Sequence, residues 1–199
     1  MEINRDQLAE LLLQALETEK GGTLVYETAL RCVVNDELRE EWKGYLEQTQ
    51  HHVEVVLGLI EEIGLDPNTE TPGRLVVRHI GESLVAAMDM ALDSGKREAA
   101  ELVAAECVVE AETKDHLNWE LISQAAKSLT GPEGKALKKA YDEVEEQEDE
   151  HLYHSTGWCR ELWIQSLGLP AVLPPPEEEK DVKTAIGAAR AKKARKKML

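Results

Sequence analysis

Apolar residues in this chain recur at alternating spacings of three and four, and this pattern most limits the possible folds. Such spacing places the apolar residues on one face of an α-helix. No segment shows the sustained alternation that indicates a β-strand. In the first helical segment, the shared face carries Leu8, Leu12, Ala15, Glu19, Gly22, Tyr26, Leu30 and Val33. The sequence therefore predicts an all-α protein.

Capping residues and helix breakers divide this pattern into separate helices. Asn4 and Asn35 can cap the first two helices, and Thr71-Pro72 is typical of the start of a third. Gly21-Gly22 falls inside the first helix, where it indicates a close approach of helices or a local bulge, and no chain reversal. The expected helices span about residues 4–34, 37–63, 71–92, 96–129 and 132–167. We expect four long helices, with a short helix in the connection between the second and the third.

Composition bounds the compartment and the partners. The 199 residues carry a formal net charge of −16, so the body of the protein should repel nucleic acid and anionic membranes. Cys32, Cys107 and Cys159 are far apart and form no Cys-x-x-Cys pair, which excludes a zinc-finger or rubredoxin-type site and favours a reducing compartment. No signal peptide is evident, and no apolar stretch reaches the roughly 20 residues of a membrane span. We expect a cytoplasmic protein.

The composition changes near Pro170, where we place a domain boundary between residues 1–169 and 170–199. Pro174-Pro175-Pro176 stiffens a linker, and the segment after Lys180 is rich in alanine, lysine and arginine. Three consecutive prolines cannot continue a helix. Because the segment offers few apolar anchors, we expect only shallow docking of this basic tail on the bundle. Contact between the tail and nucleic acid or a shell protein remains open.

Several acidic and imidazole side chains fall on faces that are otherwise apolar. Glu148 and His151 stand three residues apart on the last long helix, so they share one face. Glu19 and Glu112 occupy the apolar stripes of two other helices, each with an aromatic residue seven positions later, and His52 projects at the rim of the stripe of the second helix. Buried charges are costly unless they are paired. Carboxylate oxygen and imidazole nitrogen suit iron, manganese or zinc.

Each of these residues alone also has an ordinary structural interpretation. Glu19 could be a glutamate at the rim of the core paired with a lysine, and His52 or His151 a hydrogen-bonded core histidine. Tyr26 and Trp119 could simply pack in the core. Only the joint occurrence in four helices predicts a centre for two metal ions. The predicted ligands are Glu19, His52, Glu112, Glu148 and His151.

The full arrangement resembles the ferritin-like superfamily over about residues 4–168. The shared features are Glu-x6-Tyr followed by a helix with His, then Glu-x6-aromatic followed by Glu-x-x-His. The helix over 71–92 and the segment LEQTQHHV (46–53) resemble the bacterial YciF-type stress proteins of that superfamily. The resemblance implies an antiparallel four-helix bundle that binds two iron ions, or manganese or zinc, and gives electrons to O₂ or peroxide. It implies a non-haem di-iron oxidoreductase of ferroxidase or peroxide-consuming type in iron or oxidative stress. The helical crossover between the second and third long helices favours a homodimer over a 24-subunit cage.

One position departs from the superfamily pattern. Thr49 stands where the symmetry with Glu148 would place a glutamate. Gln48, His116 or a water could fill this position. If none does, the alternative function is a non-catalytic dimeric interaction or stress protein with a vestigial or single-metal site.

Overall fold

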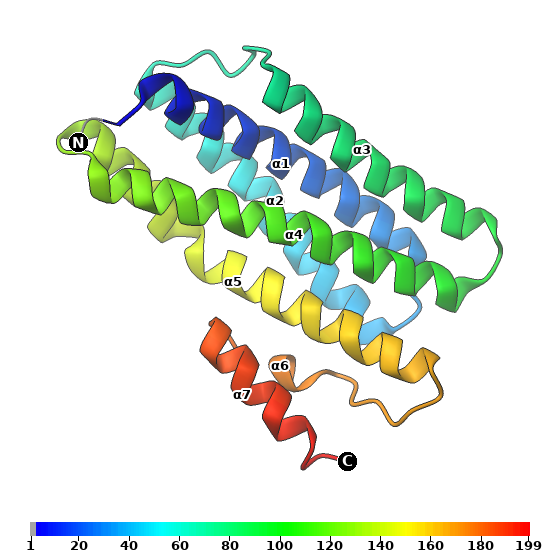
Figure 1. The fold of residues 1–199 in the computed structure, drawn as a ribbon. Coiled ribbons are helices and arrows are strands. Elements are labelled where there is room, and N and C mark those ends of the chain that lie inside the picture. The colour runs from blue at the N-terminus through cyan, green and yellow to red at the C-terminus, as the bar shows by residue number, and fades with distance from the viewer. Residues whose placement is uncertain (1–2) are drawn as a thin grey trace.

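Five long helices form over the segments that carry the three-four apolar pattern, within residues 3–199, which the computed structural model describes (Figure 1). Their bounds are α1 (Arg5–Cys32), α2 (Asp36–Ile63), α3 (Pro72–Asp93), α4 (Arg97–Ser128) and α5 (Pro132–Ser166). Two short helices follow, α6 (Pro176–Glu179) and α7 (Ala185–Arg195). The predictions of an all-α chain and of the five helical segments are confirmed.

The expected caps account for where the helices begin. The Asn4 side chain accepts hydrogen bonds from the backbone N–H groups of Asp6 and Gln7. Asn35 and Thr71 cap α2 and α3 in the same way. These side chains satisfy N–H groups that the first turn of a helix leaves without partners.

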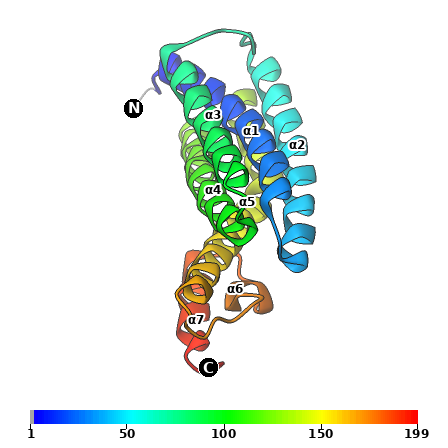
Figure 2. The ribbon, with the colours of Figure 1, turned by 90° about the vertical axis from the view of Figure 1, so that its right-hand side faces the viewer.

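Helix α3 has the expected extent of 22 residues, but it is not a mere connection, because it lies along α1 and α4 as part of the bundle (Figure 2). Two arginines attach it to α1. Arg74 Nε donates to Glu17 Oε2 at 2.7 Å, and Arg78 Nε donates to Glu17 Oε1 at 2.6 Å. Gly21 and Gly81 let the two helices approach closely, since a Cβ on Gly81 would stand 3.5 Å from the Gly21 Cα. Gly21-Gly22 therefore marks a close approach within a continuous α1.

The bundle interior holds two separate apolar clusters, one toward each end. One contains Tyr26 and Trp42, and the other contains Leu12 and Trp119. Between them lies a layer of buried polar side chains contributed by α1, α2, α4 and α5. Two apolar clusters interrupted by a buried polar layer are costly to fold unless the layer has a ligand or internal pairing. This polar layer is the candidate site.

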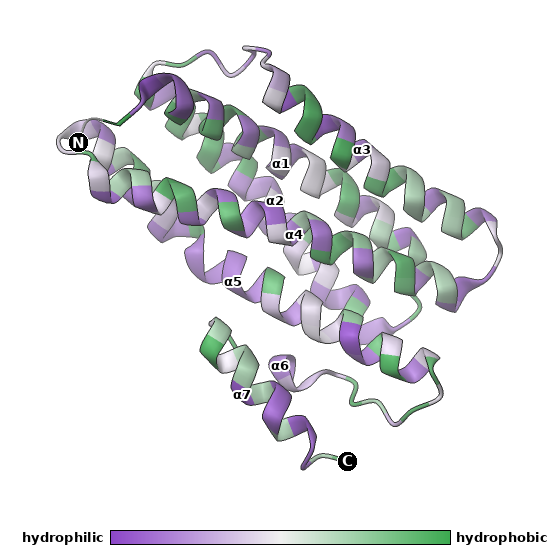
Figure 3. Cartoon of the chain, in the orientation of Figure 1, coloured by the Kyte–Doolittle hydropathy of each residue, from purple (hydrophilic) through white to green (hydrophobic). Residues whose placement is uncertain are grey.

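The hydropathy of the helices fits this packing (Figure 3). Hydrophilic and hydrophobic residues alternate around each long helix, so one face is available for the core and another for solvent. None of the helices within residues 3–199 combines the length and the apolar character needed to cross a membrane.

Candidate metal centre

The five predicted ligands come together in the polar layer, from four different helices. Glu19 lies on α1, His52 on α2, Glu112 on α4, and Glu148 and His151 on α5. All five are buried, with at most 3% of any residue exposed. His51 and Glu54, neighbours of His52 on α2, instead have 49% and 80% of their side chains exposed. Helix phase thus separates the inward histidine from its neighbours as the sequence predicts.

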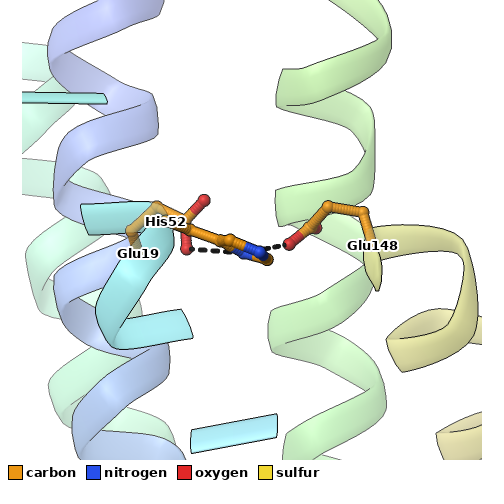
Figure 4. A group of neighbouring side chains, drawn as sticks. All are labelled: Glu19, His52 and Glu148. Carbon is orange, nitrogen blue, oxygen red and sulfur yellow. Dashed lines mark ion pairs between the residues drawn. The ribbon is translucent and has the colours of Figure 1, made fainter. Parts of the chain in front are cut away.

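The side chains face one another at short distances around His52 (Figure 4). His52 Nδ1 is 2.8 Å from Glu148 Oε1 and 3.8 Å from Glu19 Oε2. One ligand atom from each of these three residues lies within 4.8 Å of the other two. His151 Nδ1 is 3.6 Å from Glu112 Oε2 and 3.9 Å from Glu148 Oε1, the same oxygen that His52 approaches. Glu148 is therefore shared by the two halves of the centre.

The atoms that face inward lack hydrogen-bond partners, although all are buried. They are Glu19 Oε2, His52 Nδ1, Glu112 Oε2, both carboxylate oxygens of Glu148, and His151 Nδ1. Buried polar atoms almost always have a partner, and an unpartnered one is expensive. These atoms come from four helices. A cation among Glu19, His52 and Glu148, whose ligand atoms lie within 4.8 Å of one another, would give a partner to one atom of each.

Two glutamines fix the orientation of the histidines. His52 Nε2 lies 2.7 Å from Gln147 Oε1, and His151 Nε2 lies 2.7 Å from Gln48 Oε1. With the amide oxygens facing Nε2, that nitrogen is the donor, which leaves Nδ1 to face the carboxylates across a proton or a cation. Metal-binding histidines are typically held through the second ring nitrogen in this way. The two glutamines each precede a symmetry-related position, Thr49 or Glu148.

The aromatic residue that follows each core glutamate forms a hydrogen bond with the glutamate of the other helix. Tyr26 of α1 donates through its hydroxyl to Glu112 Oε1 on α4 at 2.7 Å. Trp119 of α4 donates through Nε1 to Glu19 Oε1 on α1 at 2.8 Å. Each glutamate therefore has one oxygen fixed by an aromatic residue and one oxygen free to face the centre. The sequence repeat predicted that each glutamate has an aromatic residue seven positions later. Only the tertiary structure shows that each aromatic residue bonds to the glutamate of the other helix.

Two of the residues considered for the position of Thr49 do not occupy it. His116 Nε2 pairs instead with Asp149 Oδ1 at 2.7 Å. Gln48 supports His151 through its amide oxygen. Thr49 itself is 2% exposed and lies beside α1, where a Cβ on Gly22 would stand 3.2 Å from its Cγ2. At the position of Thr49, α2 therefore contributes no carboxylate to the polar layer.

The structure adds a carboxylate that the sequence interpretation overlooked. Asp115 of α4 is 5% exposed, and its Oδ1 has no hydrogen-bond partner. It follows Glu112 by three residues, the same interval that separates Glu148 from His151. That spacing was a usable signal, since it places Asp115 on the same face as Glu112.

The electrostatics of the polar layer favour uptake of positive charge. Burial raises the pKa of Glu19, and the nearby Asp115 raises it further. Burial likewise raises the pKa of Glu148, with the charges of Glu19 and Glu112 adding to the effect. Burial lowers the pKa of His52. The imidazole is therefore kept neutral as a ligand, and the clustered carboxylates gain from a cation that replaces their protons.

A second group of ligand-type side chains, Glu41, His154 and Glu178, also has its ligand atoms within 4.8 Å of one another. Here the polar atoms have partners. His154 Nε2 donates to the Val182 carbonyl at 3.0 Å, and Nδ1 lies 2.8 Å from Glu178 Oε2. Glu41 accepts from the Tyr45 hydroxyl and from Trp158 Nε1. Both groups could hold a metal by geometry, but only the first has buried atoms left without partners.

In the second group, a protonated His154 forms ion pairs that link the tail to α5. Burial lowers the pKa of His154, but hydrogen bonds to Glu178 and Glu41 outweigh this and raise the pKa to about 10. The imidazolium then donates through both nitrogens, to Glu178 and to the Val182 carbonyl. Because Glu178 and Val182 belong to the tail, this charge ties residues 170–199 to α5.

The tail is held more firmly than the expected shallow docking. Glu161 of α5 is fully buried and accepts from Arg195 Nε at 2.7 Å. Arg160 forms a two-pronged pair with Glu177, at 2.6 and 2.7 Å. Val182 is 4% exposed and packs with α7 residues. The expectation of shallow docking is wrong because the tail is attached through paired charges as well as through apolar contacts. These charges come together only in the folded chain.

We predict that Arg195→Ala loosens the tail while Arg190→Ala, on an exposed position of the same helix, does not. Loss of Arg195 leaves one partner fewer for the buried Glu161, at a cost of roughly 1–3 kcal/mol. Hydrogen exchange over residues 170–199 should accelerate in the first variant alone. Equal exchange in the two variants would show that this ion pair does not hold the tail.

Comparisons with protein-family models, with curated proteins and with solved structures give no match for this chain.

Proposed function

We propose that this protein is a ferritin-like di-metal protein that binds two iron ions, or two manganese ions, in the polar layer of its bundle. The observation that carries the proposal is the set of buried, unpartnered oxygen and nitrogen atoms that converge from α1, α2, α4 and α5. The donor set is mixed carboxylate and imidazole, which suits iron and manganese.

The residues divide between two metal positions. Glu19 and His52 would hold one ion, and Glu112 and His151 the other, with Glu148 between them. A metal pair bound there would supply electrons to O₂ or peroxide, the chemistry of an oxidoreductase of ferroxidase or peroxide-consuming type. Gln48 and Gln147 hold the histidine tautomers, and Tyr26 and Trp119 orient the glutamates. The apolar clusters on both sides exclude water, which strengthens the electrostatic interactions within the layer.

The position of Thr49 favours a second candidate, a protein with a single metal and no turnover. A threonine methyl packed on Gly22 supplies no carboxylate to the centre. This alternative predicts one bound metal per chain, whereas the leading proposal predicts two.

Metal analysis of protein purified without chelator tests both candidates. We expect two equivalents of iron or manganese per chain, with anomalous scattering at the metal edge in the polar layer. Anaerobic loading with Fe(II) followed by O₂ should then give an absorbance change in the near ultraviolet. One equivalent without such a change would support the single-metal alternative. No bound metal after reconstitution would overturn the proposal.

A further inference from the structure

We propose that Asp115 is the sixth ligand of the centre and supplies the carboxylate that Thr49 does not. This inference rests on the proposed di-metal function. It assigns to α4 two ligands, Glu112 and Asp115, one helical turn apart.

The position of Asp115 supports this role. The residue is 5% exposed, and its Oδ1 is among the buried atoms without a hydrogen-bond partner. Burial raises the pKa of Asp115, and the charges of Glu148 and Glu112 raise it further, while burial and the charge of Asp115 in turn raise the pKa of Glu19. Carboxylates that interact in this way inside a bundle repel each other unless a proton or a cation lies between them. Asp115 therefore belongs to the half of the centre formed by Glu19, His52 and Glu148.

The charge balance of the polar layer gives a second argument. Two divalent cations carry four positive charges, whereas Glu19, Glu112 and Glu148 supply only three negative charges. With Asp115 the four carboxylate charges cancel those of two divalent cations. Within residues 3–199, Glu19, Glu112 and Glu148 form ion pairs only with His52 and His151, and Asp115 forms none. Buried charge that lacks a permanent partner favours a bound ion over an internal salt bridge.

The two hairpins of the bundle differ in where they carry carboxylates. Gly22 follows Glu19 by three residues, as Asp115 follows Glu112. In the first hairpin, Gly22 leaves space that the side chain of Thr49 fills. In the second hairpin, the corresponding positions are Asp115 and Glu148, and both carry carboxylates. The second hairpin thus supplies the acid that the first lacks, so the count of ligands is kept at six.

The test compares Asp115→Asn with Asp149→Asn, which removes a neighbouring acid that pairs with His116 on the edge of the bundle. Anaerobic titration with Fe(II) or Mn(II) measures stoichiometry and affinity. For Asp115→Asn we expect loss of one equivalent, or binding at least tenfold weaker at one position. Asp149→Asn should bind two equivalents as the unaltered chain does. In the double variant Thr49→Glu, Asp115→Asn, the lost binding should return.

Thermal unfolding in chelator separates a ligand from a structural residue. Removing an unpartnered buried carboxylate should leave the melting temperature of metal-free Asp115→Asn equal to or above that of the unaltered chain. A lower melting temperature together with lost metal would assign Asp115 a structural role and overturn the inference. Unaltered affinity in Asp115→Asn would overturn it while leaving the di-metal proposal intact. Failure of the double variant to regain binding would refute the exchange with position 49. Absence of metal in the unaltered chain would instead remove the proposed function itself.

Discussion

Replacement of Glu148 by alanine should remove both bound metals, whereas His151→Ala should remove one. Glu148 lies between the two halves, with Oε1 2.8 Å from His52 Nδ1 and 3.9 Å from His151 Nδ1, and neither of its oxygens has another partner. His151 reaches only the half that contains Glu112. Loss of a residue that merely supports a ligand weakens metal binding by about 10- to 100-fold. Loss of a shared ligand should exceed this at both positions.

The matched controls for these variants are His51→Ala and Glu54→Ala. Both residues are within two positions of His52, yet their side chains are largely exposed. Metal content by elemental analysis should remain at two equivalents in both. A loss from His51→Ala equal to that from His151→Ala would mean that the inward phase of α2 has been misassigned.

Stability of the metal-free protein should fall as pH rises above about 4.5, and bound metal should cancel this fall. Burial raises the pKa of Glu19, Asp115 and Glu148 in the folded state. A raised folded pKa means that the folded state holds its protons more tightly than the unfolded chain. The associated stability is complete below the unfolded pKa and is lost as pH rises toward the folded pKa. A divalent cation replaces these protons and removes the penalty.

Thermal melts between pH 5 and pH 8, with chelator and with metal, measure this effect. At a free metal concentration 100 times Kd, each bound metal adds about 2.7 kcal/mol, which is roughly 5–10 °C per metal for a domain of this size. The gap between loaded and chelated protein should widen as pH rises. In chelator, Glu148→Gln should flatten the pH dependence, whereas Glu143→Gln, at a half-exposed residue that pairs with His51, should not. If the difference in melting temperature between loaded and chelated protein narrowed as pH rises, the buried carboxylates would not be the source of the pH dependence.

Local patterns in the sequence were sufficient for the helices and for which side chains face inward. The three-four spacing, the caps at Asn4, Asn35 and Thr71, and the break at Gly131-Pro132 depend on neighbouring residues, and the structure confirms them. The inward phase of Glu19, His52, Glu112, Glu148 and His151 follows from 3.6 residues per turn, so it too could be predicted.

Relations between distant segments were decided only by the tertiary structure. The attachment of α3 to α1 depends on the ion pairs of Glu17 with Arg74 and Arg78. The attachment of the tail to α5 depends on the ion pair of Glu161 with Arg195. Asp115 shares a face with Glu112 in the sequence, but only the packing of α4 against α1 and α5 shows its oxygen unpartnered beside Glu19. Periodicity gives the direction of a side chain from its own helix. Which atoms it meets there depends on how helices from remote parts of the chain pack, since a buried charge is tolerated only where another element brings its partner.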